Sequence, residues 1–308
     1  MAVKLMNLRN TQSNWSVKSL VMAATIVTCA TLAPGAAQAG QMSQGWNYSI
    51  DSFKDGTEYS TIGQKSAFEF YGLAFREYKN KVVFAINSNL APAGYASSGA
   101  LGGAIGYGDL MINFGDSTLA KAEGTSNLYG VDFTKNDTNL TTGSGLYKHV
   151  TTKSLTTQNQ GYSSIQQHTN TVSNLKGKAS FGDMAADTTY FNKSAAARTH
   201  IASGNYAGGV TMIDSFSDKS KLDFGKFGAT GKYTFGFSID KSKLQTGNFV
   251  ASLFAECGND GVVINGKILG DSGIKSVPES SPLAGLAVIG LVGGALALRK
   301  CQQAKLIA

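Results

Sequence analysis

An uncharged apolar run near the C-terminus, residues 282–298, is the feature that most constrains how this chain can fold. As a helix, its seventeen residues would span roughly 25 Å, just short of the ~30 Å hydrocarbon core of a bilayer. Arg299 and Lys300 follow at once, and lysine and arginine resist translocation. A buried core helix is the alternative for so short a run, but neither face is polar and only the tail 301–308 follows. We therefore predict a transmembrane helix over 282–298 with a basic stop at Arg299 and Lys300.

The N-terminal segment has the parts of a secretory signal peptide. It begins with basic residues, contains no acid, and continues with an apolar stretch over 20–32. Ala37 and Ala39 then supply the small side chains that signal peptidase accepts beside its cleavage site. A first transmembrane helix is the alternative, but the apolar stretch is short for one. The sequence therefore predicts a signal peptide over 1–39 and cleavage before Gly40.

Basic residues concentrate in these two targeting segments. The chain has 27 lysines and arginines against 20 acids, a net charge of +7. Three of the basic residues lie in 1–39, three lie after Leu298, and one of the acids is Glu279. The remaining part has 21 basic and 19 acidic residues, which gives a net charge of +2. The basic charge therefore reflects targeting, and we expect no nucleic-acid partner.

Only one cysteine lies in the predicted exported region. Cys29 belongs to the predicted signal peptide, Cys301 follows the predicted membrane helix, and Cys257 remains. An intramolecular disulfide is therefore excluded there, although secreted domains often contain one. We expect Cys257 to be a buried small hydrophobic residue, because no base that would activate it is evident.

The region between the targeting segments, residues 40–269, is typical of a mainly β domain. Apolar side chains alternate with small or polar ones in several segments, so that Phe235, Phe237 and Ile239 share one face of a predicted strand. A region of this length suffices for one all-β domain. We predict an antiparallel β-sandwich, jelly-roll-like, with a short helical insertion and a linker over 270–276.

Turn signals predict two β-hairpins in this region. Segments 67–76 and 81–87 flank a short polar turn and indicate the first hairpin. The dipeptide Asn265-Gly266 favours a type I′ turn, and it separates the apolar segments 262–264 and 267–269. We therefore predict a second, smaller hairpin across Asn265-Gly266.

Apolar residues at helical spacing mark the predicted insertion. Ile165, His168 and Val172 recur at intervals of three and four in an otherwise polar stretch. This spacing predicts a short amphipathic helix between residues 162 and 174, and a further helix is expected over 185–197.

No catalytic motif stands out in the sequence. A nucleophile elbow, a zinc-protease motif, a Walker loop and a dinucleotide-binding glycine motif are all missing. His149, His168 and His200 do not have the spacing of metal ligands, and His168 is expected to be a core residue. Glu69 and Glu77 would stand roughly 26 Å apart along one strand, too far for the carboxylate pair of a glycosidase. We therefore expect no enzyme activity.

One cluster of oxygen-bearing residues is a candidate calcium site. Its members are Asp132, Asn136, Asp137 and Asn139. Carboxylate and amide oxygens are ligands that Ca²⁺ accepts, but the spacing is not that of an EF-hand loop. A solvated turn is the favoured interpretation here, as a hairpin turn is for Asn259-Asp260. We expect neither a metal nor a cofactor.

Val277, Pro278 and Glu279 form a short motif directly before the apolar run. With that run and its basic end, they resemble the PEP-CTERM sorting signal of Gram-negative bacteria, here over 277–300. The motif of that signal is Val-Pro-Glu-Pro, and Ser280 replaces its second proline in this chain. The resemblance implies that exosortase, a membrane cysteine protease, cuts near the motif and that the protein then passes to the cell surface or the extracellular matrix.

Five stretches of the predicted β domain carry a second resemblance. They are Trp46–Phe53, Phe68–Gly72, Tyr107–Leu110, Leu128–Phe133 and Ala251–Gly261. In these stretches the chain resembles a family of exosortase-dependent surface proteins found in cyanobacteria. The resemblance spans most of the exported region and implies a destination rather than a chemistry, so no functional site follows from it.

These features predict an exported protein without enzyme activity. It would meet signal peptidase and exosortase during export, pass through the inner membrane as an anchored intermediate, and end at the cell surface or in the extracellular matrix. Aromatic side chains and hydroxyls on exposed strands suit an association with polysaccharide, by analogy between folds. Two alternatives stay open: a glycan-active hydrolase with two carboxylates in a cleft, and a permanently anchored inner-membrane protein with a periplasmic domain.

Overall fold

The computed structural model describes residues 40–134 and 143–270. Within these ranges, no helix is both long and apolar enough to cross a membrane. The predicted signal peptide, sorting signal and tail lie outside the described residues. So do these predicted site residues: Ala37, Ala39, Asn136, Asp137, Asn139, Val277, Pro278, Glu279, Arg299 and Lys300. What the sequence predicts for them stays a prediction.

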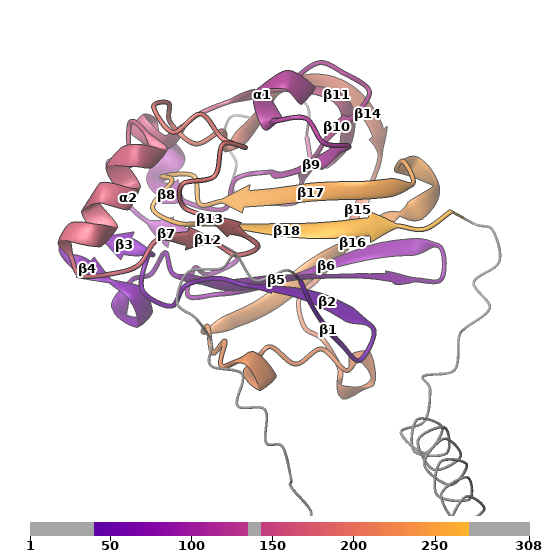
Figure 1. Ribbon diagram of the computed structural model, residues 1–308, viewed down its shortest axis with the longest axis horizontal. Coiled ribbons are helices and arrows are strands. Elements are labelled where there is room, and N and C mark those ends of the chain that lie inside the picture. Colours follow the sequence, from indigo (N-terminus) through magenta and orange to yellow (C-terminus); the bar gives the residue numbers. More distant parts are fainter. Residues whose placement is uncertain (1–39, 135–142, 271–308) are drawn as a thin grey trace, which may run out of the picture. The chain divides into compact units, whose positions relative to one another are not determined.

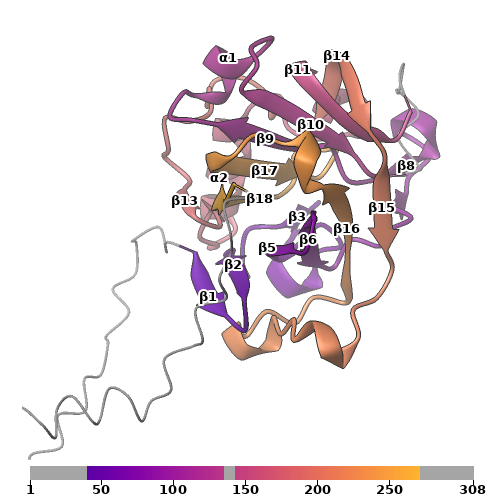
Figure 2. The same cartoon turned by 90° about the vertical axis from the view of Figure 1, so that its right-hand side faces the viewer.

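Two six-stranded antiparallel sheets face each other in the described part of the chain (Figures 1 and 2). The first sheet has the strand order β1 (Gln41–Ser43), β2 (Trp46–Ile50), β5 (Phe70–Tyr78), β6 (Lys81–Ser88), β16 (Tyr233–Asp240), β15 (Val210–Ile213). The second has the order β14 (His200–Gly208), β11 (Gly145–Lys153), β10 (Leu128–Asp132), β9 (Leu110–Phe114), β17 (Gly247–Phe254), β18 (Gly261–Ile268).

Many neighbouring strands follow each other in the sequence and pair within one sheet. The pairs β5–β6, β9–β10, β10–β11 and β17–β18 are of this kind, and the chain crosses to the opposite sheet after β6, β14 and β16. The mainly β, antiparallel architecture predicted from the sequence is therefore confirmed. The β5–β6 pair also confirms the hairpin predicted between 67–76 and 81–87.

Large aromatic side chains fill the space between the two sheets. Phe249 of β17 packs edge-on against Phe75 of β5, with 5.0 Å between the ring centroids. Phe133, which directly follows β10, stacks on Phe237 of β16 at 4.7 Å. All four rings are buried. Phe235, Phe237 and Ile239 of β16 all belong to the core between the sheets, so the shared face predicted for them is confirmed.

The outer faces of both sheets are also covered. A segment between β15 and β16 packs on the first sheet, where Trp46 Nε1 donates a 2.9 Å hydrogen bond to the carbonyl of Ser220. Connecting segments cover the second sheet; they include α1 (Leu119–Ala122) and Phe181, whose ring meets Phe254 of β17 edge-on. Strands such as β9 and β10 are consequently buried on both faces.

The helix predicted between residues 162 and 174 is confirmed as α2 (Ile165–Asn174). It begins after Ser164, whose hydroxyl accepts the backbone N–H of Gln167 at 3.0 Å. A serine at this position satisfies a donor that has no partner inside the helix. The apolar face of α2 is buried and contains His168.

The prediction of a second helix over 185–197 is wrong. This segment forms turns. The carbonyl oxygen of Lys193 accepts the backbone N–H of Gln166, and that of Ala195 accepts the backbone N–H of Ile165. The first N–H groups of a helix need partners from outside the helix. The segment therefore provides hydrogen-bond acceptors for the first turn of α2 and does not form a helix of its own.

The prediction of a hairpin across Asn265-Gly266 is also wrong. Strand β18 continues through both residues, and they pair with Val250 and Phe249 of β17. A Cβ atom at position 266 would lie 2.3 Å from the ring of Phe249. The glycine therefore makes room for an aromatic ring, which is why a glycine in this strand does not mark a turn.

Three short strand pairs gather with α2 at one end of the two sheets, on the left in Figure 1. They are β3 (Thr57–Glu58) with β4 (Thr61–Ile62), β7 (Tyr95–Ala96) with β8 (Ala104–Ile105), and β12 (Ser180–Phe181) with β13 (Met184–Ala185). Connections from both sheets meet at this end, and the candidate site lies among them.

Candidate functional site

Four buried acids, which we call the carboxylate cluster, lie at this end of the domain. Asp51 directly follows β2, and Asp55 lies in the connection from β2 to β3. Glu69 directly precedes β5, and Asp260 directly precedes β18. None of the four is more than 5% exposed. Because β2 and β5 belong to the first sheet and β18 to the second, the cluster connects the ends of the two sheets.

The four acids are close enough to act on one another. Asp51, Asp55 and Asp260 can each offer one carboxylate oxygen, and these atoms all lie within 4.8 Å of one another. The charge of Glu69 also acts on Asp55 and on Asp260. The cluster is therefore a compact set of carboxylates and not a scatter of separate buried acids.

Ser180 of β12 holds two members of the cluster in place. Its hydroxyl donates a hydrogen bond to Asp51 Oδ1, and its backbone N–H donates to Asp55 Oδ2 at 2.7 Å. The backbone N–H of Gly182 adds a second bond to Asp51 Oδ1, at 2.8 Å. The β12–β13 pair thus fixes how both aspartates are oriented.

Backbone N–H groups hold the other two members. Glu69 Oε2 accepts the N–H of Gly56 at 2.8 Å. Asp260 accepts the N–H of Phe70 on Oδ2 at 2.7 Å and that of Gly261 on Oδ1 at 2.8 Å. The bond to Phe70 runs from the first sheet to an acid of the second, so the cluster itself links the sheets.

Three buried oxygens of the cluster have no hydrogen-bond partner: Asp51 Oδ2, Asp55 Oδ1 and Glu69 Oε1. In the part of the chain that the structure describes, no lysine or arginine forms an ion pair with any of the four acids. Buried charges in proteins are normally paired or coordinate a metal. Among the described residues, the cluster therefore lacks the positive partner that its acids would need in their ionised form.

Burial and mutual repulsion make the ionised form of these acids unfavourable without such a partner. Burial raises the pKa of Asp51 to about 7. Burial and then the charge of Asp51 raise the pKa of Glu69 to about 9. For the same two reasons, burial first and neighbouring carboxylates second, the pKa values of Asp55 and Asp260 lie well above their ordinary range.

His168 does not supply the missing positive charge. Its Nε2 lies 3.0 Å from the carbonyl oxygen of Asp55, and the ring is buried in the apolar face of α2. Burial lowers the pKa of His168 to about 4, so the ring is neutral at neutral pH. The expectation that His168 is a hydrogen-bonded core residue is confirmed.

The described structure does not bring Glu69 and Glu77 together as a glycosidase pair. Glu77 lies near the opposite end of β5 from Glu69, and its Oε2 pairs with Lys241 Nζ at 2.7 Å. Asp132 is buried at the end of β10, while the other three members of its candidate calcium cluster lie outside the described residues. Of the acids that the sequence analysis considered, Glu69 and Asp260 belong to the carboxylate cluster.

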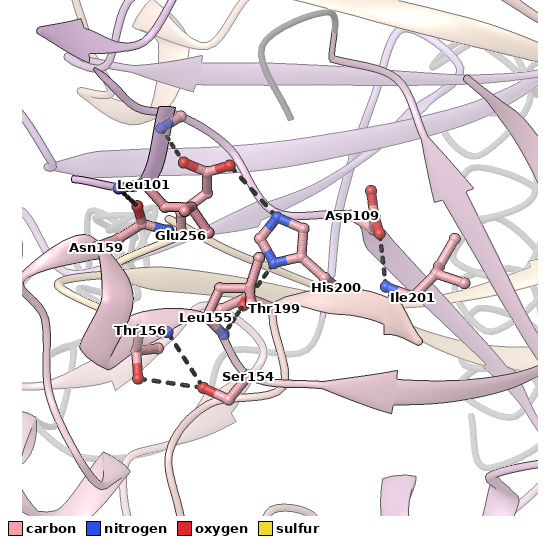
Figure 3. A network of polar contacts seen from close by, with 11 residues as sticks. Leu101, Asp109, Ser154, Leu155, Thr156, Asn159, Thr199, His200, Ile201 and Glu256 are labelled. Atoms are coloured by element: carbon pink, nitrogen blue, oxygen red, sulfur yellow. Dashed lines mark hydrogen bonds and ion pairs between the residues drawn. The ribbon is translucent and has the colours of Figure 1, made fainter. Parts of the chain in front are cut away.

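A second buried polar network surrounds His200 (Figure 3). His200 Nε2 lies 3.4 Å from Glu256 Oε1, and His200 Nδ1 lies 2.8 Å from Thr199 Oγ1. The hydroxyl, imidazole and carboxylate resemble a catalytic triad in type, but all three side chains are at most 4% exposed. Because a substrate cannot reach Thr199, the network serves to satisfy polar groups at the ends of β14 and β17.

Cys257 lies next to this network in the sequence. The thiol is free and fully buried, and burial raises its pKa well above the ordinary range. A thiolate is the reactive form of cysteine, and burial in apolar surroundings suppresses it. The expectation that Cys257 is buried is confirmed.

Three tyrosines line a pocket of about 280 Å³ beside the carboxylate cluster. Tyr59, at the tip of the β3–β4 hairpin, is 85% exposed, and Tyr95 and Tyr162 are half-buried. Amide and carboxylate side chains also line it: Glu58, Gln160, Gln167 and Asn259. We call this the tyrosine pocket; it combines aromatic faces with hydrogen-bonding groups at an accessible surface.

Hydrogen bonds of Thr57 hold together the wall of the tyrosine pocket that lies next to the carboxylate cluster. The backbone N–H of Thr57 donates to the carbonyl of Asn259 at 3.0 Å, and Asn259 Nδ2 donates to the carbonyl of Thr57 at 2.8 Å. Thr57 Oγ1 also lies 3.0 Å from the hydroxyl of Tyr162. Asn259 directly precedes Asp260, so the cluster supports one wall of the pocket.

A larger open groove of about 810 Å³ lies elsewhere, between β1, β2 and the β17–β18 pair. Its lining includes Gly40, the first described residue, and Leu269, next to the last one. Its charged residues are Arg76, Glu77, Asp116 and Lys267, and its one glutamate, Glu77, is paired with Lys241. We assign no ligand to this groove.

Comparisons with known proteins found no match for this chain. No family model matches the chain, and neither a curated protein nor a solved structure matches it significantly. The candidate site therefore depends on the geometry of this chain alone.

Sequence reasoning missed most of the carboxylate cluster because its members are far apart in the chain. Glu69 was compared only with Glu77, and Asp260 was interpreted as part of a hairpin turn. One local signal was present: Asp51, Glu69 and Asp260 each stand at the boundary of an apolar strand. Which of these boundaries meet depends on the pairing of the sheets, and no local pattern reveals that.

Proposed function

We propose that this chain is a non-enzymatic exported protein of the cell surface or extracellular matrix that binds polysaccharide through the tyrosine pocket. The export part of the proposal is supported by the predicted signal peptide and by the resemblance of 277–300 to a PEP-CTERM signal. In this account exosortase processes the protein at an inner-membrane stage, as expected for the cyanobacterial family that the chain resembles. The jelly-roll-like topology and the transmembrane helix over 282–298 belong to the same proposal.

The tyrosine pocket is the observation that carries the binding activity. A sugar ring presents C–H faces that pack on aromatic rings and hydroxyls that bond to amide and carboxylate groups. The ring of Tyr59 is largely exposed to solvent. The backbone of Tyr59 has a φ of 51°, a conformation that a bulky residue rarely adopts. A strained, exposed aromatic residue at the rim of a pocket is typical of a ligand-binding site.

The same pocket argues against the glycan-active hydrolase. Glycosidases need two carboxyl groups that face the scissile bond from about 5–10 Å apart. Glu58 is the one acid among the residues that line the tyrosine pocket. The carboxylate cluster does not line this pocket, and its members are buried away from substrate.

Glycan binding can be tested with the purified protein on an array of bacterial exopolysaccharide fragments. We expect Tyr59→Ala to weaken binding about tenfold or more, because the exposed stacking surface is lost. Tyr206→Ala is the matched control, since Tyr206 is also exposed, at 61%, and lies outside the pocket. Equal binding by all three proteins would refute the proposal. Release of new reducing ends, abolished by Glu58→Gln, would favour the hydrolase instead.

A further inference from the structure

We propose that the carboxylate cluster binds a single calcium ion, with Asp51, Asp55 and Asp260 as ligands and Glu69 beside them. The inference goes beyond the proposed function and does not depend on it. It departs from the sequence analysis, which expected no metal and placed its candidate calcium site around Asp132.

The unpartnered oxygens are the first observation behind this proposal. Asp51 Oδ2 and Asp55 Oδ1 are buried without a hydrogen-bond partner, while donors from Ser180 and Gly182 occupy the opposite oxygen of each group. Metal ligands in proteins are oriented in this way, with one atom toward the ion and the other held by a neighbouring donor. Glu69 repeats the arrangement, with Gly56 on Oε2 and nothing on Oε1.

The spacing of the ligand atoms fits one ion. Oxygen ligands lie about 2.3–2.6 Å from Ca²⁺, so two of them on opposite sides are at most ~5 Å apart. The candidate atoms of Asp51, Asp55 and Asp260 fall within 4.8 Å of one another. Three oxygens at such spacings lie at most ~2.8 Å from a common point, so small side-chain adjustments suffice for a single ion to contact all three.

The chemistry of the ligands selects calcium among the common cations. Every candidate ligand atom is a carboxylate oxygen, which hard cations prefer, whereas zinc prefers cysteine and histidine. Mg²⁺ usually keeps several of its waters, and a cluster in which no member is more than 5% exposed leaves little space for them. Ca²⁺ accepts a dehydrated site made of protein oxygens, with two-oxygen contact from individual carboxylates.

The position of the cluster indicates what the ion does. Asp51 and Asp55 follow a strand of the first sheet, Asp260 directly precedes a strand of the second, and Ser180 belongs to the β12–β13 pair. An ion bound there connects three parts of the domain that have no covalent crosslink, because the one cysteine of the described chain is free. Calcium therefore takes the structural role that disulfides have in many exported domains.

Calorimetry on the protein as cells produce it, purified in detergent and stripped with EDTA, tests the proposal. Titration with CaCl₂ should show one ion per chain and no comparable signal from MgCl₂. The melting temperature should rise by about 5–10 °C when Ca²⁺ is ~100-fold above its Kd, because the ion binds only the folded state. An unchanged melting temperature, with no heat of Ca²⁺ binding, would overturn the proposal and leave a cluster of protonated acids.

Two variants locate the ion. Asp55→Asn keeps the shape of the side chain but removes its charge, so we expect Ca²⁺ binding at least about tenfold weaker and a metal-free melting temperature that does not fall. Asp109→Asn is the matched control, because Asp109 is also buried and accepts a backbone N–H, from Ile201 at 2.7 Å, outside the cluster. Full loss of binding in Asp132→Asn, with normal binding in Asp55→Asn, would place the ion at the site suggested by the sequence and contradict the proposal.

Discussion

The backbone N–H of Ser180 donates a 2.7 Å hydrogen bond to Asp55 Oδ2, although 125 positions separate the two residues. The hydroxyl of the same serine donates to Asp51 Oδ1. Both bonds leave the opposite oxygen of an aspartate buried and unpartnered. One serine of the β12–β13 pair therefore orients two of the three proposed calcium ligands.

Replacement of Ser180 by alanine tests this positioning role. Ser180→Ala keeps the N–H bond to Asp55 but removes the hydroxyl bond to Asp51. We expect Ca²⁺ affinity, measured by titration calorimetry, to fall about 10- to 100-fold, as is usual when a group that orients a metal ligand is lost. Ser173→Ala on the exposed side of α2 is the control and should bind Ca²⁺ like the unmodified protein. Unchanged affinity in Ser180→Ala would show that the hydroxyl does not position a ligand.

Stability of the metal-free protein should decrease as pH rises. In the folded state, the pKa values of Asp51 and Glu69 are raised to about 7 and about 9, whereas unfolded acids titrate near 4. A carboxyl group whose pKa is raised by folding stabilises the folded state fully below its unfolded pKa, and this stabilisation is lost as pH rises through the folded pKa. We expect the melting temperature in EDTA to fall between about pH 5 and pH 9, measured by scanning calorimetry.

Calcium should reduce this loss, because the ion replaces the protons that the buried acids would otherwise keep. The gain in melting temperature from Ca²⁺ is therefore expected to be larger at about pH 8 than at about pH 5. A Ca²⁺ effect that grows as pH falls would be incompatible with carboxylate ligands.

Gly266→Ala should destabilise the domain by about 1–3 kcal/mol. Its new Cβ would lie 2.3 Å from the ring of Phe249, which is packed between the two sheets and cannot move freely. Gly209→Ala is the control, because its Cβ would meet only the hydroxyl of Tyr206, at 3.8 Å. Chemical denaturation of both variants measures the difference, and equal stability would mean that Phe249 can repack at little cost.

Export should depend on the motif at 277–280. We expect the double variant Pro278→Ala with Glu279→Ala to accumulate at the inner membrane with its C-terminal tail attached, because exosortase no longer recognises it. Mass spectrometry of the C-terminus in membrane and surface fractions measures this. A double variant that still reaches the surface with a shortened C-terminus would contradict processing by exosortase. An unmodified protein that keeps its tail in the membrane fraction would instead indicate a permanent anchor.

Local features of the fold were predictable from the sequence. The β5–β6 hairpin follows from two apolar segments around a short polar turn, and α2 follows from the helical spacing of its apolar residues. The turn predicted at Asn265-Gly266 is wrong because the glycine leaves space for the ring of Phe249 on the neighbouring strand. A local turn signal and a tertiary packing constraint select the same residue, and the sequence does not distinguish them.

The carboxylate cluster was beyond sequence reasoning for a related reason. Asp51 and Asp55 are close in the chain, but Asp260 comes more than two hundred residues later and meets them only when both sheets have formed. Burial also could not be foreseen, since acids beside turns are usually solvated. The structure shows that these acids lie close together and that they are buried, and the two observations together identify a candidate metal site.

The central claim, a calcium ion among Asp51, Asp55 and Asp260, is tested most directly by anomalous diffraction from crystals grown with CaCl₂. Data collected at long wavelength, where calcium scatters anomalously, should show one strong peak in the cluster. We predict that it lies about 2.3–2.6 Å from Asp51 Oδ2, from Asp55 Oδ1 and from an oxygen of Asp260. A map without a peak at that position, in which the four acids instead bond to one another or to a water molecule, would contradict the claim.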